Sequence, residues 1–204
     1  MIAIVDYGSG NVGAIANIYK QLKIPHQITG DLRDLEAADR YILPGVGAFD
    51  ATMGYLSTSG IMELLSEQIL EGGKKVLGVC VGMQIMADSS EEGVLPGLGW
   101  IHGQVRRIDV ATLPAAPHLP HMGWNSVAPR PGARLFEDVD PVRGFYFLHS
   151  YHFEAADAAD VAATVEYGRQ LTCAVARGNV YGVQFHPEKS HANGVAVFRS
   201  FAEL

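Results

Sequence analysis

Hydrophobic and polar positions follow two different periods along the first 90 residues. Short runs rich in apolar residues predict strands at 1–6, 26–29, 41–43 (ended by Pro44) and 74–80. The last of these, "KKVLGVC", is apolar enough to be buried on both faces. Helical spacing appears between the runs, so strands and helices alternate along this half of the chain. That alternation implies a parallel sheet with helices on both faces.

The helices of this half are marked by their ends as well as by their period. Residues 12–22 form the first predicted helix, and a long second one begins at Ser59 as its N-cap. Gly72 and Gly73 end that second helix. A third helix is expected to start immediately after residue 80, in "VGMQIMADS".

The hydrophobic pattern changes near Trp100, where the strand-like runs become shorter and are separated by turn residues. The runs are "WIHGQVRRI", "GWNSV", "GFYFLHSYHF", "AATVEY", "LTCAVARG" and "NVYGVQFH". They predict an antiparallel extension of the same sheet, closed by a helix in "NGVAVFRSFAEL". The Pro-rich stretch 112–124 is the candidate linker, but it is short and flanked by strands. We therefore expect an α/β fold in which residues 1–204 form a single domain.

Composition and charge exclude more classes of binding partner than they exclude folds. A chain of 204 residues with 48% hydrophobic content suits one domain with a sizeable core. The formal net charge of -7, without a Lys/Arg stripe, argues against nucleic acid or a membrane surface as a partner. No leader-like segment and no apolar run of about 20 residues is seen, so a cytoplasmic location is expected. Two cysteines, Cys80 and Cys173, are too few for a disulfide framework.

The opening glycine loop matches a known fingerprint. Residues 8–13, "GSGNVG", read as G-x-G-x-x-G between a predicted strand and a predicted helix, and Asp31 and Asp34 lie about 20 residues further on. The pattern is typical of dinucleotide-binding folds. A non-catalytic nucleotide-binding module is therefore one alternative for this chain.

Cys80 stands where a buried strand turns directly into a helix, between Gly78 and Gly82. This is the nucleophile-elbow pattern G-x-S-x-G with Cys in place of Ser. Such a turn exposes the side chain, and the N–H of the following Val81 points to where an oxyanion would form. A small buried cysteine in a Gly-rich turn would give the same pattern, so the elbow alone does not decide the function.

The second half of the constellation lies near the C-terminus, in "YGVQFHPEKS". A predicted strand delivers His186, Pro187 then forces a turn, and Glu188 follows two residues after the histidine. A thiol nucleophile needs a base, and the base needs an acceptor on its other ring nitrogen. Cys80, His186 and Glu188 can fill these three roles.

Three motifs in order, "LPGVGAF", "LGVCVGMQ" and "GVQFHPEKS", resemble the class I, triad-type glutamine amidotransferases across nearly the whole chain. One subfamily matches further. The glutaminase subunits of imidazole glycerol phosphate synthase, an enzyme of histidine biosynthesis, have motifs similar to "DYGSGN", "PHMGWN", "YFLHSY" and the Lys-Ser after His-Pro-Glu. The resemblance implies a flavodoxin-like three-layer fold with an open mixed sheet. It also implies that Gly13 lies inside the first helix and that the dinucleotide match is accidental.

The resemblance further implies a site for glutamine hydrolysis. Cys80 would be the nucleophile, His186 the base and Glu188 its orienting acceptor, with an oxyanion hole from Val81 and from Val46 or Gly47. By position, the residues that match substrate contacts are Gln84, Glu92, Ser150 and Tyr151. The expected partner is a separate cyclase chain of (β/α)8-barrel type that receives the ammonia. Positions that match the interface or its coupling are Asn11, His121, Trp124 and Lys189.

No cofactor is expected, and the histidine spacings do not predict a metal site. His118-x-x-His121 and His149-x-x-His152 have suggestive spacing, but they fall on a loop and on a strand without further ligand types. Cys173 is expected to fill a strand. A second alternative keeps the glutaminase chemistry and changes the partner, since similar subunits serve other synthases such as surface-sugar amidotransferases.

Overall fold

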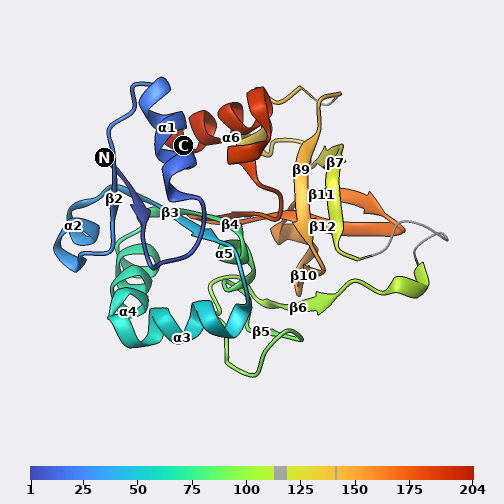
Figure 1. Ribbon diagram of the computed structural model, residues 1–204, viewed down its shortest axis with the longest axis horizontal. Helices are drawn as coiled ribbons and strands as arrows, with labels where there is room; N and C mark the ends of the chain where they lie inside the picture. The colour runs from blue at the N-terminus through green and yellow to red at the C-terminus, as the bar shows by residue number, and fades with distance from the viewer. Residues whose placement is uncertain (113–118, 141) are drawn as a thin grey trace.

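A computed structural model describes residues 1–112, 119–140 and 142–204 of the chain (Figure 1). Its strands are β1 (Ile2–Val5), β2 (His26–Thr29), β3 (Arg40–Gly45), β4 (Lys75–Cys80), β5 (Ser89–Ser90), β6 (Gly103–Arg107), β7 (His121–Asn125), β8 (Val127–Pro129), β9 (Phe145–His149), β10 (Tyr151–Ala155), β11 (Val161–Tyr167), β12 (Arg169–Arg177) and β13 (Val180–Val183). Its α-helices are α1 (Val12–Gln21), α2 (Leu32–Ala37), α3 (Phe49–Ser59), α4 (Ile61–Ser66), α5 (Val81–Gln84) and α6 (His191–Glu203).

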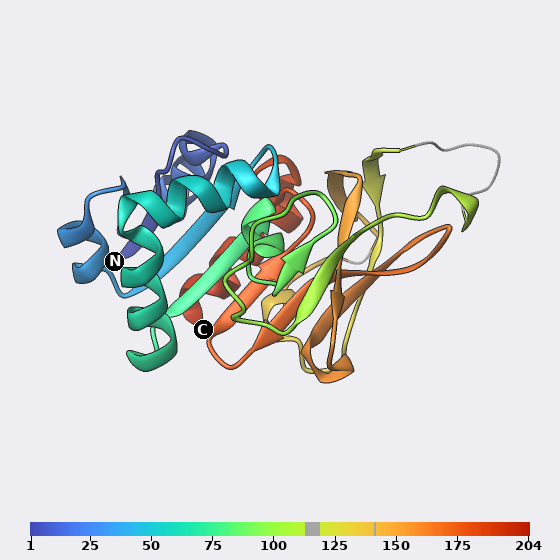
Figure 2. The same ribbon diagram turned by 90° about the horizontal axis from the view of Figure 1, so that it is seen from below.

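The main sheet has the strand order β2-β1-β3-β4-β13-β12-β10-β6-β5, with β11 and β8 attached through β12. The first five strands of this order are parallel, and β13 then pairs antiparallel with β12. Helices α1 and α6 lie on one face of the parallel half, and α3, α4 and α5 lie on the other (Figures 1 and 2). The expected mixed α/β fold, parallel at the start and antiparallel at the end, is confirmed, except that β13, expected in the antiparallel part, pairs parallel with β4.

The strands β7 and β9 do not extend the main sheet as expected. They pair with each other in a separate two-stranded ribbon that packs against β11 (Figure 1). The run 144–153, expected as one strand, is therefore divided at Ser150, after which β10 joins β6 and β12. This division places Ser150 at a bend between the two sheets.

Several predicted boundaries were wrong for reasons the structure makes clear. The strand expected to end at Pro44 runs to Gly45, because β3 pairs with β4 on that side through Gly45. Ser59 is the last residue of α3 and not the cap of the next helix, since Gly60 takes a left-handed φ of 76° between α3 and α4. The long second helix is α4 followed by a π-helical turn, Glu67–Glu71.

The parallel strands bring several chain segments to one edge of the sheet. The carboxyl ends of β1, β3, β4 and β13 meet there, and the strands themselves are almost wholly buried. In open α/β sheets this edge is where ligands bind. Among the helices of the described ranges, none is long and apolar enough to cross a bilayer.

Candidate active site

The turn from β4 into α5 holds Cys80 in a strained conformation. Its φ of 56° and ψ of -112° lie in a region that L-residues rarely adopt. The elbow also requires its two glycines, since a Cβ on Gly82 would collide with the carbonyl of Leu43, and one on Gly78 would collide with the backbone of Gly82. Strain of this kind, held by close backbone packing, is found where a side chain must be presented for chemistry.

His186 and Glu188 form a buried pair next to that elbow. His186 Nδ1 and Glu188 Oε1 are 2.9 Å apart, and the two side chains are 3% and 2% exposed. Burial alone would lower the pKa of His186, but Cys80 and Glu188 together outweigh it through hydrogen bonds and charge and raise that pKa to about 10. An imidazole held between a thiol and a carboxylate can take the thiol proton and keep it at neutral pH.

A cavity of about 310 Å³ opens above Cys80. Most of the residues predicted for the site line it, namely Val46, Gly47, Cys80, Val81, Gln84, Glu92, Ser150, Tyr151, His186 and Lys189. The β9–β10 bend, the β3 end and the β4 elbow thus meet around one space. Glu188 lies behind His186 and does not line the cavity.

Gln84 stands in the cavity wall with its amide orientation set by the backbone. Its Nε2 donates to the carbonyl oxygen of Tyr151 at 3.1 Å and to Oε1 of Gln184, also at 3.1 Å. Both amide hydrogens are used in these bonds, so Gln84 can offer a ligand its Oε1 acceptor. That fits the predicted contact with a polar group of the substrate.

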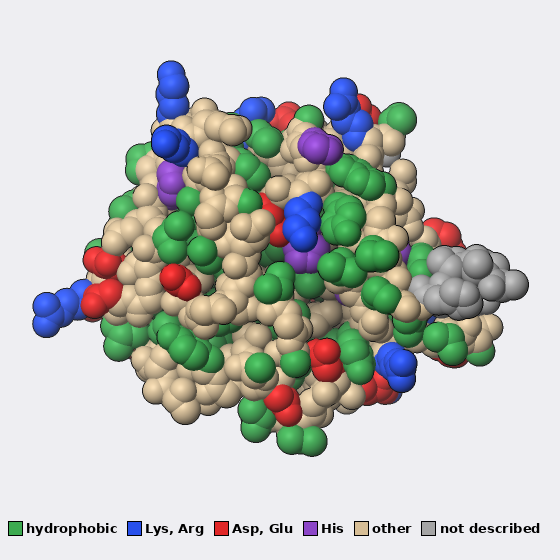
Figure 3. Space-filling model, in the orientation of Figure 1, with side chains coloured by type: hydrophobic (Ala, Val, Ile, Leu, Met, Phe, Trp, Pro, Cys, Tyr) green, Lys and Arg blue, Asp and Glu red, His purple; other side chains and the backbone are tan. Residues whose placement is uncertain are grey.

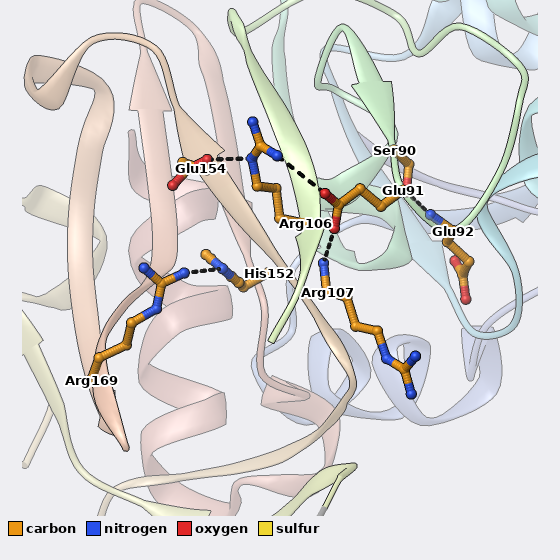
Figure 4. A network of polar contacts seen from close by, with 8 residues as sticks. All are labelled: Ser90, Glu91, Glu92, Arg106, Arg107, His152, Glu154 and Arg169. Atoms are coloured by element: carbon orange, nitrogen blue, oxygen red, sulfur yellow. Dashed lines mark hydrogen bonds and ion pairs between the residues drawn. The ribbon is translucent and has the colours of Figure 1, made fainter. Parts of the chain in front are cut away.

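Glu92 reaches the cavity from a loop that its neighbours anchor. Its Oε2 accepts the N–H of Phe49 at 2.9 Å, which also satisfies the first turn of α3. The adjacent Glu91 turns the other way and binds Arg106 and the backbone N–H of Arg107 (Figure 4). These two bonds lower the pKa of Glu91, that to the Arg107 N–H having the larger effect, and they hold the loop so that Glu92 faces inward.

The loop after β3 is held by two side chains from the opening motif. Tyr7 donates its hydroxyl hydrogen to the carbonyl of Pro44. Ser9 Oγ both accepts the N–H of Val46 at 3.0 Å and donates to the Val46 carbonyl at 2.6 Å. The Val46 N–H, one of the two predicted oxyanion donors from this loop, is therefore engaged by Ser9 in this conformation.

The four predicted interface residues lie in different settings. Asn11 is exposed and caps α1, its Oδ1 accepting the Ala14 N–H at 3.3 Å. Trp124 is 49% exposed and stacks on His191 with 5.3 Å between ring centroids. Lys189 is exposed with its Nζ 5.6 Å from the Tyr146 ring centroid. His121, by contrast, is only 3% exposed, so its side chain can act on a partner only through its neighbours.

Exposed apolar side chains gather over the β7–β9 ribbon. On the face shown in Figure 3, hydrophobic groups cluster where Figure 1 draws this ribbon. Met122, Trp124 and Leu148 contribute, with exposed fractions of 65%, 49% and 38%. The patch borders the cavity, because Leu148 lines it.

The residues of the possible dinucleotide fingerprint have structural roles within the protein. Gly13 lies in α1, Asp31 caps α2, and Asp34 accepts from Gln27 and Thr29. The acids placed to bind a ribose are thus bonded within the protein. His118 lies outside the described residues, and those residues contain no group of three possible metal ligands.

Sequence reasoning missed one residue close to the sulfur and two that hold the loop after β3. Gln184 is completely buried, and its Nε2 lies 3.7 Å from Cys80 Sγ. The signal was a polar residue inside the apolar run "VYGVQF", where burial requires a partner. Tyr7 and Ser9 were missed because their bonds reach Pro44 and Val46, 37 residues away.

Known proteins resemble this chain over its full length. The profile of the family described as glutamine amidotransferase class-I matches residues 3–203. The chain is 48% identical over 204 residues to imidazole glycerol phosphate synthase subunit HisH of Leptospira borgpetersenii, with 100% of both chains covered. The protein of the same name from Bdellovibrio bacteriovorus is 48% identical over 206 residues, again with 100% of both covered.

Solved structures agree on the architecture. A glutamine amidotransferase superposes with a TM-score of 0.72 at 20% identity, covering 100% of both chains. PurLQS from Thermotoga maritima gives a TM-score of 0.69 at 18% identity, covering 99% of this chain and 97% of its own. At this identity the two structures establish the fold alone.

Proposed function

The chain belongs to the class-I glutamine amidotransferase family, and from that membership we propose that it is the ammonia-supplying subunit of an imidazole glycerol phosphate synthase. Relatives 48% identical over their whole length bear that subunit name. The observation that carries the chemistry is the strained Cys80 elbow beside the buried His186–Glu188 pair. Residues 1–204 act as one domain in this proposal, which the profile match over 3–203 supports.

In the first half of the reaction, the Cys80 sulfur attacks the side-chain carboxamide carbon of glutamine while His186 holds the thiol proton. The tetrahedral intermediate collapses when the C–N bond breaks, and His186 gives its proton to the departing nitrogen. Ammonia leaves and a γ-glutamyl thioester remains on Cys80. Glu188 keeps the imidazole oriented and balances its charge throughout.

In the second half, His186 removes a proton from water, which attacks the thioester carbon. The C–S bond breaks, the sulfur recovers the proton through His186, and glutamate leaves. Gln84 and Glu92, together with Ser150 and Tyr151, hold the polar ends of glutamine in the cavity they line. Their different donor and acceptor groups suit a substrate with both an amide and an amino-acid end.

The oxyanion of each tetrahedral intermediate is bound by the N–H of Val81 and by a second N–H from Val46 or Gly47. The Val46 N–H is occupied by Ser9 in the isolated chain, which supports a resting state with an incomplete oxyanion hole. The chain alone is therefore a poor glutaminase. Binding of the partner and its nucleotide substrate favours the loop conformation that completes the hole.

The partner is a separate cyclase chain of (β/α)8-barrel type. Ammonia must reach it uncharged and shielded from water, so the cavity mouth has to face the cyclase. The apolar patch on the β7–β9 ribbon, next to that mouth, supports this orientation. The cytoplasmic location expected from the sequence suits a biosynthetic pair of this kind.

The variant Cys80→Ser tests the assignment directly. With the cyclase present, it should form no product from glutamine but normal amounts from added ammonia, because the loss is confined to the ammonia supply. Steady-state assays with each nitrogen source measure both. Retained glutaminase activity in the variant would remove Cys80 from its role.

The partner assignment has its own experiment. Glutamine hydrolysis should rise steeply when the histidine-pathway cyclase and its nucleotide ligand are added to the wild-type chain. Equal rates with and without them would contradict the proposed latency. If the chain purified from its own cells brings a different synthase with it, the chemistry stands and the partner proposal is wrong.

A further inference from the structure

A continuous chain of hydrogen bonds connects the sulfur of Cys80 to the backbone of the β9–β10 bend. Gln184 Nε2 lies 3.7 Å from Cys80 Sγ, and Gln184 Oε1 accepts from Gln84 Nε2 at 3.1 Å. Gln84 Nε2 also donates to the carbonyl of Tyr151 at 3.1 Å. Gln184 is completely buried and does not line the cavity, so its amide faces the sulfur from within the protein.

The direction of these hydrogen bonds follows from the Tyr151 carbonyl oxygen, the one group in this series that can only accept a hydrogen. The Tyr151 carbonyl requires the NH₂ of Gln84, which therefore has a second hydrogen for Gln184 and needs an oxygen there. Gln184 presents its Oε1 to Gln84, and its NH₂ then faces Cys80. The sulfur consequently receives an N–H donor rather than facing a carbonyl.

A buried histidine pair fixes the Tyr151 carbonyl from the other side. His149 Nδ1 donates to this oxygen at 2.8 Å, and His149 Nε2 accepts from His121 Nδ1 at 2.9 Å. Burial lowers the pKa of His149 to about 3, so the ring stays neutral and its tautomer is set by the carbonyl. The hydrogen bond from His149 that fixes the Tyr151 carbonyl therefore does not change with pH near neutrality.

We propose that Gln184 is a further residue of the catalytic machinery, which donates an amide hydrogen to the Cys80 sulfur and stabilises its negatively charged form. The inference rests on the proposed role of Cys80 as the nucleophile. The titratable groups that face the sulfur are His186 and Tyr7, and Glu92 and Lys189 line the same cavity. Gln184, which follows β13, gives the sulfur an uncharged hydrogen-bond donor that these four titratable side chains do not provide.

The variant Gln184→Met tests the donor, because it keeps the length and volume of the side chain and removes the amide. Iodoacetamide alkylation of Cys80 at neutral pH, followed by mass spectrometry of the Cys80 peptide, measures the reactive sulfur without any glutamine turnover. A hydrogen bond to a charged group is worth about 1.5–3 kcal/mol, so the alkylation rate should fall about 10- to 100-fold. Exposed Gln170→Met is the matched control and should alkylate like wild type.

A second variant keeps the test decisive if Gln184→Met does not fold. Gln184→Glu has the same shape and can still accept from Gln84, but it brings a carboxylate and no donor to the sulfur. Its Cys80 alkylation should be slower still, and far-UV circular dichroism with thermal unfolding checks that each variant is folded. Alkylation of folded Gln184→Glu or Gln184→Met at the wild-type rate would overturn the proposal.

Glutamine kinetics with the cyclase separate this role from simple support of the cavity. In Gln184→Glu, which keeps the acceptor for the Gln84 amide, loss of the donor to the sulfur should lower kcat and leave KM unchanged, because Gln184 does not line the cavity. A rise in KM with kcat unchanged would mean that Gln184 only shapes the glutamine site. If wild type itself hydrolyses no glutamine, the proposed function fails, while the alkylation result still decides the role of Gln184.

Discussion

The Glu188 carboxylate is buried with an incomplete set of partners. Its Oε1 binds His186, and within the described ranges its Oε2 has no hydrogen-bond partner. A buried carboxylate in this position is costly unless the neighbouring imidazole is charged. Cys80 and Glu188 raise the pKa of His186 although burial lowers it, so the imidazole carries the charge that the buried carboxylate needs.

Glu188→Gln should therefore change how stability depends on pH. In wild type the charged His186 stabilises the fold fully below the ordinary pKa of 6.5, and that stabilisation is lost as the pH rises toward about 10. The variant lacks one of the two groups that raise this pKa, so it should be less stable than wild type just below 6.5. The difference should close as the pH approaches 10.

Urea titrations at both ends of that window give the two free energies of unfolding. Exposed Glu203→Gln on α6 is the control and should show no such pH-dependent difference. A Glu188→Gln deficit that grows toward high pH would mean that His186 does not hold its charge in the folded chain.

Single residues with local signals were predictable, and those with distant partners were not. Cys80 and His186 were found because the elbow glycines and the His-Pro-Glu turn lie beside them in the sequence. Gln184 sits in an equally readable strand, but its partner sulfur is 104 residues away. A pattern shows that a buried amide needs a partner, and only the fold shows which one.

At the scale of elements, the segments with complete local signals were the ones predicted correctly. The strand β1 is an unbroken apolar run, β4 is apolar after Lys75, and α1 begins at a capping Asn11. The helix α3 was missed because its N-cap, Ala48, provides no side-chain bond, while its first turn is satisfied by Glu92, 43 residues further on. Long-range capping of this kind leaves no trace in the local sequence.

The loop after β3 is the element whose conformation matters for rate. Ser9→Ala removes the hydroxyl that binds both the N–H and the carbonyl of Val46, so the loop should turn its N–H toward the cavity more often. The variant should hydrolyse glutamine faster than wild type when no cyclase is present, by about 3- to 10-fold if one net hydrogen bond is lost. Stimulation by the cyclase should shrink by the same factor.

Steady-state glutaminase assays with and without the partner measure both effects. Ser57→Ala removes an exposed hydroxyl on α3 that bonds only within its own helix, and it serves as the control. An unstimulated rate equal to wild type in Ser9→Ala would show that Ser9 does not restrain the loop. A lower rate in both conditions would instead mean that Ser9 supports the active conformation.

For the whole molecule, the parallel start of the sheet was predictable because apolar runs alternate with helical spacing there, although the helices α2 and α3 were not predicted. The convergence of β3 and β4 at one edge followed from that topology, but β13 was expected in the antiparallel extension and instead pairs parallel with β4, which brings it to the same edge. The β7–β9 ribbon was not predictable, because "GWNSV" and "GFYFLHSYHF" carry nothing that tells a separate ribbon from an extension of the sheet. Nothing in these runs shows that β10 pairs with β6 and β12 while β9 pairs only with β7.

That ribbon is where the partner should bind, and Trp124 is the residue to test. Trp124 is half-exposed, stacks on His191 and lies in an apolar patch with Met122 beside the cavity. Partly buried tryptophans in such patches dominate binding energies, so Trp124→Ala should weaken cyclase binding by about 2 kcal/mol or more, roughly 30-fold in Kd. Calorimetric titration measures it.

The matched control for Trp124→Ala is Leu70→Ala. Leu70 is 57% exposed in the turn that precedes β4, at the end of the sheet opposite the cavity. Its replacement should leave both Kd and stimulated glutaminase activity unchanged. Cyclase stimulation in Trp124→Ala should recover at high cyclase concentration, because the residue contributes to docking and lies outside the cavity lining. Unchanged Kd in that variant would move the interface to another face of the molecule, and a stimulation that never recovers would give Trp124 a part in the coupling itself.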